Sequence, residues 1–151
     1  MRKRIELISI LLLSAAGIFI IDQAIKQIFL DGYRYIGDCI DLILVYNRGV
    51  AFSMFAFLAE SLKWIQIVLL SGVVGYTLWL GKRCYVLPVG IMAGAGFSNV
   101  WDRFLHGGVV DYVYWHCGFD FAVFNFADVM IDAAVLGLFL VNLKPMICKN
   151  D

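Results

Sequence analysis

Four long apolar runs constrain this chain more than any other feature of its sequence. They cover residues 7–29, 64–80, 84–103 and 124–143. The hydrocarbon core of a bilayer is about 30 Å thick and takes about 20 apolar residues to cross as a helix. With 151 residues, 62% of them hydrophobic, the chain has room for these spans and their connections. We therefore predict an all-α membrane protein with four transmembrane helices in a single integral membrane domain, residues 1–151.

The first run also has an alternative interpretation. Residues 7–21 are uncharged, follow the basic sequence "RKR" and contain the small-residue stretch "SAAG", all of which a cleaved secretory signal would show. The helical pattern, however, continues through "DQAIKQIFL", and three more apolar runs follow. A retained first span is the better interpretation.

The basic residues predict the orientation of the spans, because Lys and Arg in short loops resist translocation. They flank the spans at alternate ends, so all of them fall on one side of the membrane: Arg2, Lys3, Arg4, Lys82, Arg83, Lys144 and Lys149. Both termini are then cytoplasmic, and residues 31–63 and 104–123 face the opposite compartment. Within the first of these segments, residues 42–60 are too interrupted by Asn47 and Arg48 to span. We expect them to form part of a small extracytoplasmic β-like cradle and then an interfacial amphipathic helix.

Ionisable and amide side chains inside the spans collect toward the outer ends. Each ionisable one costs several kcal/mol, about 2.5 to 3.5 at a helix centre, so each needs a partner or a function. Helical spacing places them in three groups that each share one face: Asp22 with Lys26, Asn99 with Asp102 and Arg103, and Asn125 with Asp128. Asp22 and Lys26 could form a structural ion pair or belong to a site, and Arg103 could extend outward to the interface. Asp132 could share a proton with Asp128, but we expect it to point into the bundle.

Several classes of function lack their signatures. The net charge is zero with no basic stripe, which argues against nucleic-acid binding. The four cysteines, Cys39, Cys84, Cys117 and Cys148, have no metal-ligand spacing, so zinc is not expected and free thiols are the simplest interpretation, although Cys39 and Cys117 could bond outside the membrane. His106 and His116 have no partnered Ser or Cys. No GxSxG, HExxH or Gly-rich phosphate loop occurs.

Two aspartates in apolar surroundings remain, Asp111 in "GGVVDYVYW" and Asp128 in "FNFADVMID". Two carboxyl groups held close together share a proton, so one can accept a proton from water while the other hydrogen-bonds a substrate carbonyl. This chemistry is peptide hydrolysis without a metal or a covalent intermediate. Two alternatives remain open on these residues alone. One is a non-enzymatic membrane component in which polar residues hold the helices together. The other is a small proton-coupled transporter that uses Asp128 and Asp132 as relay residues.

The motifs "DQAIK", "YNRGVAFS", "SNVWDRFLHGGVVDY" and "FNFADV" resemble, in order and separation, those of the bacterial lipoprotein signal peptidases, the type II signal peptidases. The resemblance covers nearly the whole chain. It implies an intramembrane aspartyl endopeptidase at the outer face of the bacterial cytoplasmic (inner) membrane. Such an enzyme removes signal peptides from diacylglyceryl-modified prolipoproteins, cutting before the lipidated cysteine.

The resemblance also implies roles for individual residues. Asp111 and Asp128 match the catalytic pair, and seven positions match residues that bind substrate or brace the site: Asp22, Lys26, Asn47, Asn99, Asp102, Arg103 and Asn125. No cofactor is implied, the partners are the lipid-modified prolipoprotein and membrane lipid, and we expect a monomer. The sequence departs from the family where Ser98 replaces the usual Gly before Asn99. We expect its hydroxyl to bond back within its own helix.

Overall fold

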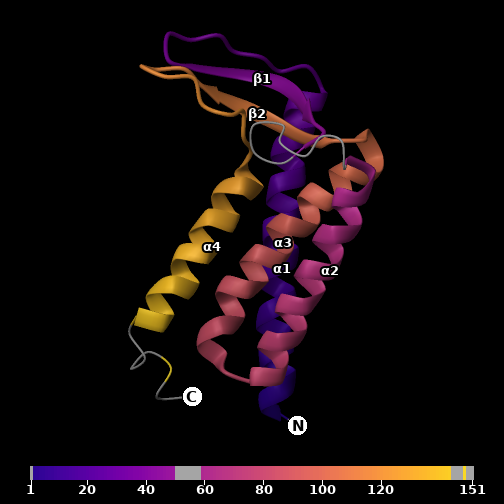
Figure 1. Cartoon of the computed structure of the whole chain (residues 1–151), viewed down its shortest axis with the longest axis vertical. Helices are drawn as coiled ribbons and strands as arrows, with labels where there is room; N and C mark the ends of the chain where they lie inside the picture. The colour runs from indigo at the N-terminus through magenta and orange to yellow at the C-terminus, as the bar shows by residue number, and fades with distance from the viewer. Residues whose placement is uncertain (1, 50–58, 144–147, 149–151) are drawn as a thin grey trace.

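Four helices and a two-stranded antiparallel sheet make up the fold (Figure 1). The computed structural model describes residues 2–49, 59–143 and 148. The helices are α1 (Arg2–Leu30), α2 (Ala59–Leu80), α3 (Arg83–His106) and α4 (Phe126–Leu143). All four are long and apolar enough to cross a membrane. The prediction of four transmembrane helices is confirmed, with α1 and α2 each beginning about five residues before the predicted start.

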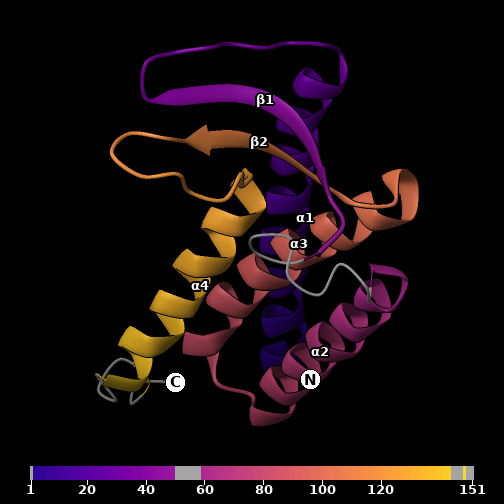
Figure 2. The same ribbon diagram turned by 45° about the horizontal axis from the view of Figure 1, so that its top comes forward.

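Helix α3 is the centre of the bundle, with α1 behind it and α2 and α4 on either side (Figures 1 and 2). Half of its most apolar window is buried inside the protein, against 11–17% for the other three helices. Its mean hydropathy is correspondingly low, 1.2 compared with 2.2 for α1. A helix that faces protein rather than lipid can carry small and polar residues, and the buried faces of α3 carry its polar residues.

Two glycines let α1 and α3 approach closely. A Cβ atom added at Gly94 would overlap the backbone of Ala15, and one added at Gly90 would overlap Ser14 Oγ and the backbone of Leu11. The spacing of these glycines, four residues apart on one helix face, is the small-residue pattern that brings membrane helices together. This close packing holds the polar ends of α1 and α3 nearest the sheet against each other.

The sheet lies beyond one end of the bundle (Figure 1). Strand β1 (Ile40–Asn47) pairs antiparallel with β2 (Val109–Trp115), with an irregularity between Leu42 and Val45. Asp111 lies opposite Val45, which makes Asn47 its diagonal neighbour on the same face. The predicted β-like cradle is thus confirmed over Ile40–Asn47, whereas the predicted amphipathic helix falls mostly on residues 50–58, outside the described residues.

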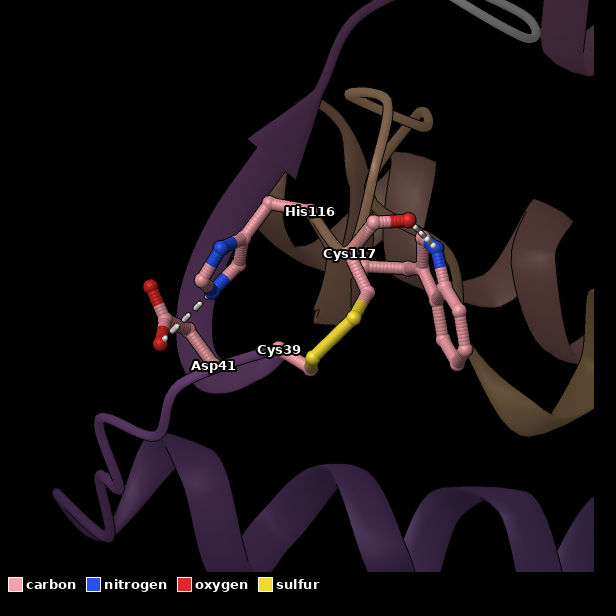
Figure 3. The surroundings of a disulfide bond; sticks show 5 residues. Cys39, Asp41, His116 and Cys117 are labelled. Atoms are coloured by element: carbon pink, nitrogen blue, oxygen red, sulfur yellow. Dashed lines mark hydrogen bonds and ion pairs between the residues drawn. A yellow bond between two sulfur atoms is a disulfide. The ribbon is translucent and has the colours of Figure 1, made fainter.

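The cysteines are bonded, so the expectation of free thiols is wrong. Cys39 bonds Cys117 and Cys84 bonds Cys148. Figure 3 shows the first bridge, which joins the chain just before β1 to the chain just after β2. Beside it, the His116 amide donates to the Cys39 carbonyl, and the His116 ring lies within ion-pair distance of Asp41, 3.2 Å. The sequence left this pair open because the two cysteines are 78 residues apart and only the folding of the sheet brings them together.

The close approach of α1 and α3 predicts the effect of one added methyl group. Gly94→Ala should destabilise the protein by about 1–3 kcal/mol, the usual penalty for overpacking, because the new Cβ would meet backbone that cannot rotate away. Gly75→Ala on α2 is the matched control, since its Cβ would have no neighbour within 4 Å. Thermal unfolding in detergent measures both variants. Equal midpoints for Gly94→Ala and wild type would contradict the packing described here.

Candidate active site

Lys26 is a fully buried cation near the C-terminal end of α1, and all of its donors are used. Its Nζ lies 2.6 Å from Asp22 Oδ2 and 2.7 Å from Asp102 Oδ2, and it donates to Asn99 Oδ1 at 2.9 Å. An ammonium group has three N–H donors, so these three acceptors satisfy it completely. The predicted pairing of Asp22 with Lys26 is confirmed, and the pair is joined to α3.

The two carboxylates beside Lys26 connect this cluster to other elements. Asp102 accepts the amide of Val110 in β2 at 3.1 Å, and Asp22 accepts the amide of Ala127 in α4 at 2.9 Å. Ser98 Oγ donates to Asp22 Oδ2 at 2.6 Å, so its hydroxyl reaches across to α1 and does not bond back within α3 as expected. Gln23 Nε2 in turn donates to Ser98 Oγ and to Asp102 Oδ1, both at 2.8 Å. The sequence did not single out Gln23, whose polar character inside an apolar span was the available signal.

Asp128 lies in the first turn of α4, where the helix is capped by side chains. Asn125 Oδ1 accepts the Asp128 amide at 2.9 Å, and Asp128 Oδ2 accepts the Asn125 amide at 3.1 Å. This reciprocal arrangement is a capping box, and the carboxylate also benefits from the positive end of the helix dipole. The Phe126 amide donates to the Tyr112 hydroxyl at 2.9 Å. The amides that α4 leaves without helical partners are therefore bonded to groups of the site.

Asp111 lies on β2, is nearly inaccessible and accepts two side-chain amides. Asn47 donates to its Oδ2 at 3.0 Å and Asn125 donates to its Oδ1 at 2.7 Å. Burial, followed by the negative charge of Asp128, raises the pKa of Asp111 to about 7. The two amide hydrogen bonds and the charge of Lys26 act in the opposite direction. A neutral carboxyl at Asp111 is therefore available near neutral pH.

The amides of Asn99 and Asn125 are held in one orientation by their neighbours. Asn99 Oδ1 accepts from Lys26 and from Asn125 Nδ2, which directs Asn99 Nδ2 to Asp128 Oδ1 at 2.9 Å. Lys26 can only donate, so the oxygen of Asn99 must face it. As a result, both amides present N–H groups to the two carboxyls, Asn99 to Asp128 and Asn125 to Asp111.

Arg103 is buried, 5% exposed, so it does not extend outward to the interface, which was the alternative left open for it. Its Nε donates to Gln66 Oε1 of α2 at 3.0 Å, and its terminal nitrogens donate to the carbonyls of Arg48 and Gly49. The guanidinium thus holds the chain that follows Asn47 against α3. Gln66 was missed by the sequence analysis, where it was one polar residue in an apolar run.

A cavity of about 480 Å³ brings these residues together. Both Asp111 and Asp128 line it, and so do Asn47, Gln66, Asn99, Arg103, Asp132 and the apolar chain 121–124 with Val129 and Ile131. Of the nine predicted site residues, Asp22, Lys26, Asp102 and Asn125 lie behind this wall rather than on it. Asp132 is exposed and faces the cavity, so the expectation that it points into the bundle is wrong.

The histidines lie away from the two carboxyls. His106 packs against the Tyr46 ring and His116 lies beside Asp41. Within residues 2–49, 59–143 and 148, no group of three His, Cys, Asp or Glu side chains is arranged to hold a metal ion. What the described cavity offers chemically is a pair of carboxyls fixed by amides, able to hold one proton between them and to polarise a water molecule.

Known proteins resemble this chain in sequence and in fold. The family described as signal peptidase (SPase) II matches residues 14–144. The lipoprotein signal peptidase of Sulfurimonas denitrificans is 68% identical over 98% of this chain and 97% of its own length. That of a Sulfurovum species is 57% identical over 88% of this chain and 92% of its own length.

Two solved bacterial membrane enzymes share the fold. The first has a TM-score of 0.77 at 23% identity and covers 92% of this chain and 90% of its own. The second has a TM-score of 0.74 at 24% identity, with 89% and 92% covered. Since the family match extends over most of the chain, the protein belongs to the signal peptidase II family, which cleaves signal peptides from prolipoproteins.

Proposed function

We propose that this signal peptidase is an aspartic endopeptidase whose catalytic residues are Asp111 and Asp128. One observation carries the proposal: the two carboxyls come from different elements, each accepts N–H groups that fix it, and both line the same cavity. The substrate is a diacylglyceryl-modified prolipoprotein, cut just before its lipidated cysteine. Family membership displaces the two alternatives that the sequence left open, a transporter and a passive component.

The hydrogen bonds suggest how the pair divides the work. Asp111, with its raised pKa, holds the proton, and Asp128, at a helix N-terminus, is the carboxylate. Asp128 takes a proton from a water molecule whose oxygen attacks the scissile carbonyl carbon, while Asp111 gives its proton to the carbonyl oxygen. When the C–N bond breaks, Asp128 passes its proton to the leaving nitrogen and Asp111 recovers one from a hydroxyl of the intermediate. The pair then returns to its starting state.

The remaining residues act by positioning. Asn47, Asn99 and Asn125 occupy lone pairs of the two carboxyls and prevent them from rotating. Arg103 fixes the chain beside Asn47, and Lys26 with Asp22 and Asp102 supports Asn99 and the start of α4. Such support matters because a displacement of about 1 Å at reacting groups can cost about a hundredfold in rate.

The position of the pair supports an orientation in the membrane. The start of α1, the end of α4 and the turn from α2 to α3 lie at the end of the bundle opposite the sheet (Figure 1), and the basic Lys82 and Arg83 belong to that turn. By the positive-inside rule, both termini are cytoplasmic and the pair works at the outer face of the bacterial cytoplasmic membrane. Lys144 and Lys149, which also entered this prediction, lie outside the described residues. A substrate whose signal peptide is already in the bilayer would reach the cavity along α4.

Replacing either carboxyl by an amide should abolish cleavage. Asp111→Asn and Asp128→Asn keep the side-chain size but cannot exchange the proton, so initial rates on a lipidated prolipoprotein should fall by at least 10²-fold. The double variant should be little worse than either single one, because the two residues act as a unit.

Asp31→Asn is the matched control for this experiment. Asp31 is exposed just after α1, and among the described residues its side chain bonds Gln27, one turn away, so its variant should cleave at the wild-type rate. Thermal unfolding in detergent separates lost catalysis from lost folding. A rate within about threefold of wild type for either dyad variant would show that the assignment is wrong.

The raised pKa of Asp111 predicts the pH dependence. Above about pH 7 Asp111 loses the shared proton, so kcat/KM should fall as the pH rises through that value. Because the folded state binds this proton more tightly than the unfolded state does, the same group also lowers stability as the pH rises from about 4 to about 7. A rate profile over pH 5 to 9, with circular dichroism at each pH, measures both effects. A rate that keeps rising above pH 7 in folded enzyme would contradict the proton assignment.

Reporter fusions test the orientation. A reporter after Lys149 or beside Lys82 should be active on the cytoplasmic side, and one inserted near Asp38 should be active outside. The physical reason is that the basic residues resist translocation. The opposite result at any of the three positions would move the pair to the wrong face for a signal peptidase.

A further inference from the structure

Asp132 is a carboxyl in the cavity that the mechanism does not use. It lies on α4 one turn beyond Asp128, farther from the sheet, and its exposed side chain lines the same cavity. The described residues offer it no hydrogen bond and no ion pair. A carboxyl at this depth disfavours insertion of the helix, so its presence calls for a partner.

The other polar side chains of the cavity wall are engaged within the protein. Asn99, Asp111 and Asp128 bond one another through the amide network. Gln66 Oε1 accepts from Arg103, whose other nitrogens bond the carbonyls of Arg48 and Gly49. Within the described part of the wall, Asp132 is therefore the side chain whose carboxyl oxygens accept no hydrogen bond.

A bound substrate brings a donor that needs such an acceptor. A peptide must be extended at the bond to be cut, so its backbone N–H groups there lose their helical partners, and in a cavity within the membrane each unpaired group is costly. Signal peptide residues before the cut lie deeper in the membrane than the cut itself. Asp132 is four helical residues deeper than Asp128, about 6 Å at about 1.5 Å per residue. Two residues of extended chain span about the same distance.

We propose that Asp132 binds substrate, accepting a hydrogen bond from the main-chain N–H of the second residue before the scissile bond. This inference rests on the proposed function, because it takes the position of the cut from the Asp111 and Asp128 pair. The contact recognises backbone rather than side chain. It therefore strengthens binding without selecting one signal sequence over another, and it takes no part in proton transfer.

Two substitutions at Asp132 separate binding from proton transfer. Asp132→Val removes the acceptor and should raise KM about tenfold with kcat within about twofold of wild type. Asp132→Asn keeps an acceptor oxygen but cannot take up a proton, so both constants should stay within about twofold. Ala133→Val is the control for an apolar change at the neighbouring exposed position, which does not line the cavity. Unchanged KM in Asp132→Val, or an Asp132→Asn variant as impaired as Asp132→Val, would overturn the proposal.

Synthetic lipopeptides test the contact from the substrate side. An ester in place of the amide removes the N–H of one chosen residue. In the wild type, the ester at the second residue before the cut should lower kcat/KM about tenfold, and the same ester at the fifth residue should lower it by less than twofold. In Asp132→Val, the ester at the second residue should lower kcat/KM by less than twofold relative to the amide substrate.

Equal losses at the second and fifth residues in the wild type, or equal ester losses in wild type and Asp132→Val, would overturn the contact. The wild-type comparison needs no variant to fold. Either result leaves the catalytic pair standing, because that assignment depends on Asp111→Asn and Asp128→Asn, which change the rate on every substrate.

Discussion

The buried ammonium group of Lys26 is the interaction on which the rest of the structure depends. A fully buried cation is tolerated only when its charge and its donors are matched, and here two carboxylates and one amide oxygen match both. Those acceptors come from α1 and α3, so the close contact of these helices at Gly90 and Gly94 is a condition for the ion cluster. Removing one member would leave an uncompensated buried charge, which costs far more than an exposed ion pair is worth. The helix packing and the polar cluster therefore stabilise each other.

Lys26 determines the geometry of the cavity wall through the orientation of two side-chain amides. Because Lys26 donates to the side-chain oxygen of Asn99, the side-chain N–H of Asn99 is directed at Asp128. The side-chain N–H of Asn125 is likewise directed at Asp111. If either side-chain amide were flipped, its oxygen would lie against a carboxylate oxygen, and the two would repel each other. The charge on Lys26 thus fixes two orientations that sequence alone leaves open. Asp22 and Asp102 extend the same cluster to the amides of Ala127 and Val110, which anchors α4 and β2.

The sequence predicted what depends on spacing along one helix and missed what depends on how helices face each other. The four spans, the pairing of Asp22 with Lys26 and the shared face of Asn125 and Asp128 follow from length and from i, i+3 and i, i+4 separations. The ion pair of Lys26 with Asp102, the hydrogen bond of Arg103 to Gln66 and the direction of Ser98 depend on the rotation of α1, α2 and α3 about their axes. The bond between Cys39 and Cys117 was open for a similar reason, since it depends on the register of β1 and β2. The catalytic roles of Asp111 and Asp128 came from the motifs, and they stay predictions until they are tested.

The cavity lies where helix and sheet meet because neither element could form it alone. A side chain on a lipid-facing helix has no second wall, and an isolated two-stranded sheet is only marginally stable in water. Here the sheet is held at several points: Val110 to Asp102, Tyr112 to the start of α4, and Cys39 to Cys117 at its far end. The strand brings Asp111 to the boundary between the sheet and the bundle, and the start of α4 brings Asp128 to the same boundary, so the two carboxyls line one cavity although 16 intervening residues separate them in sequence. Beyond that boundary, the polar groups of the wall bond one another, and the exposed Asp132 is placed where an extended substrate backbone would need an acceptor.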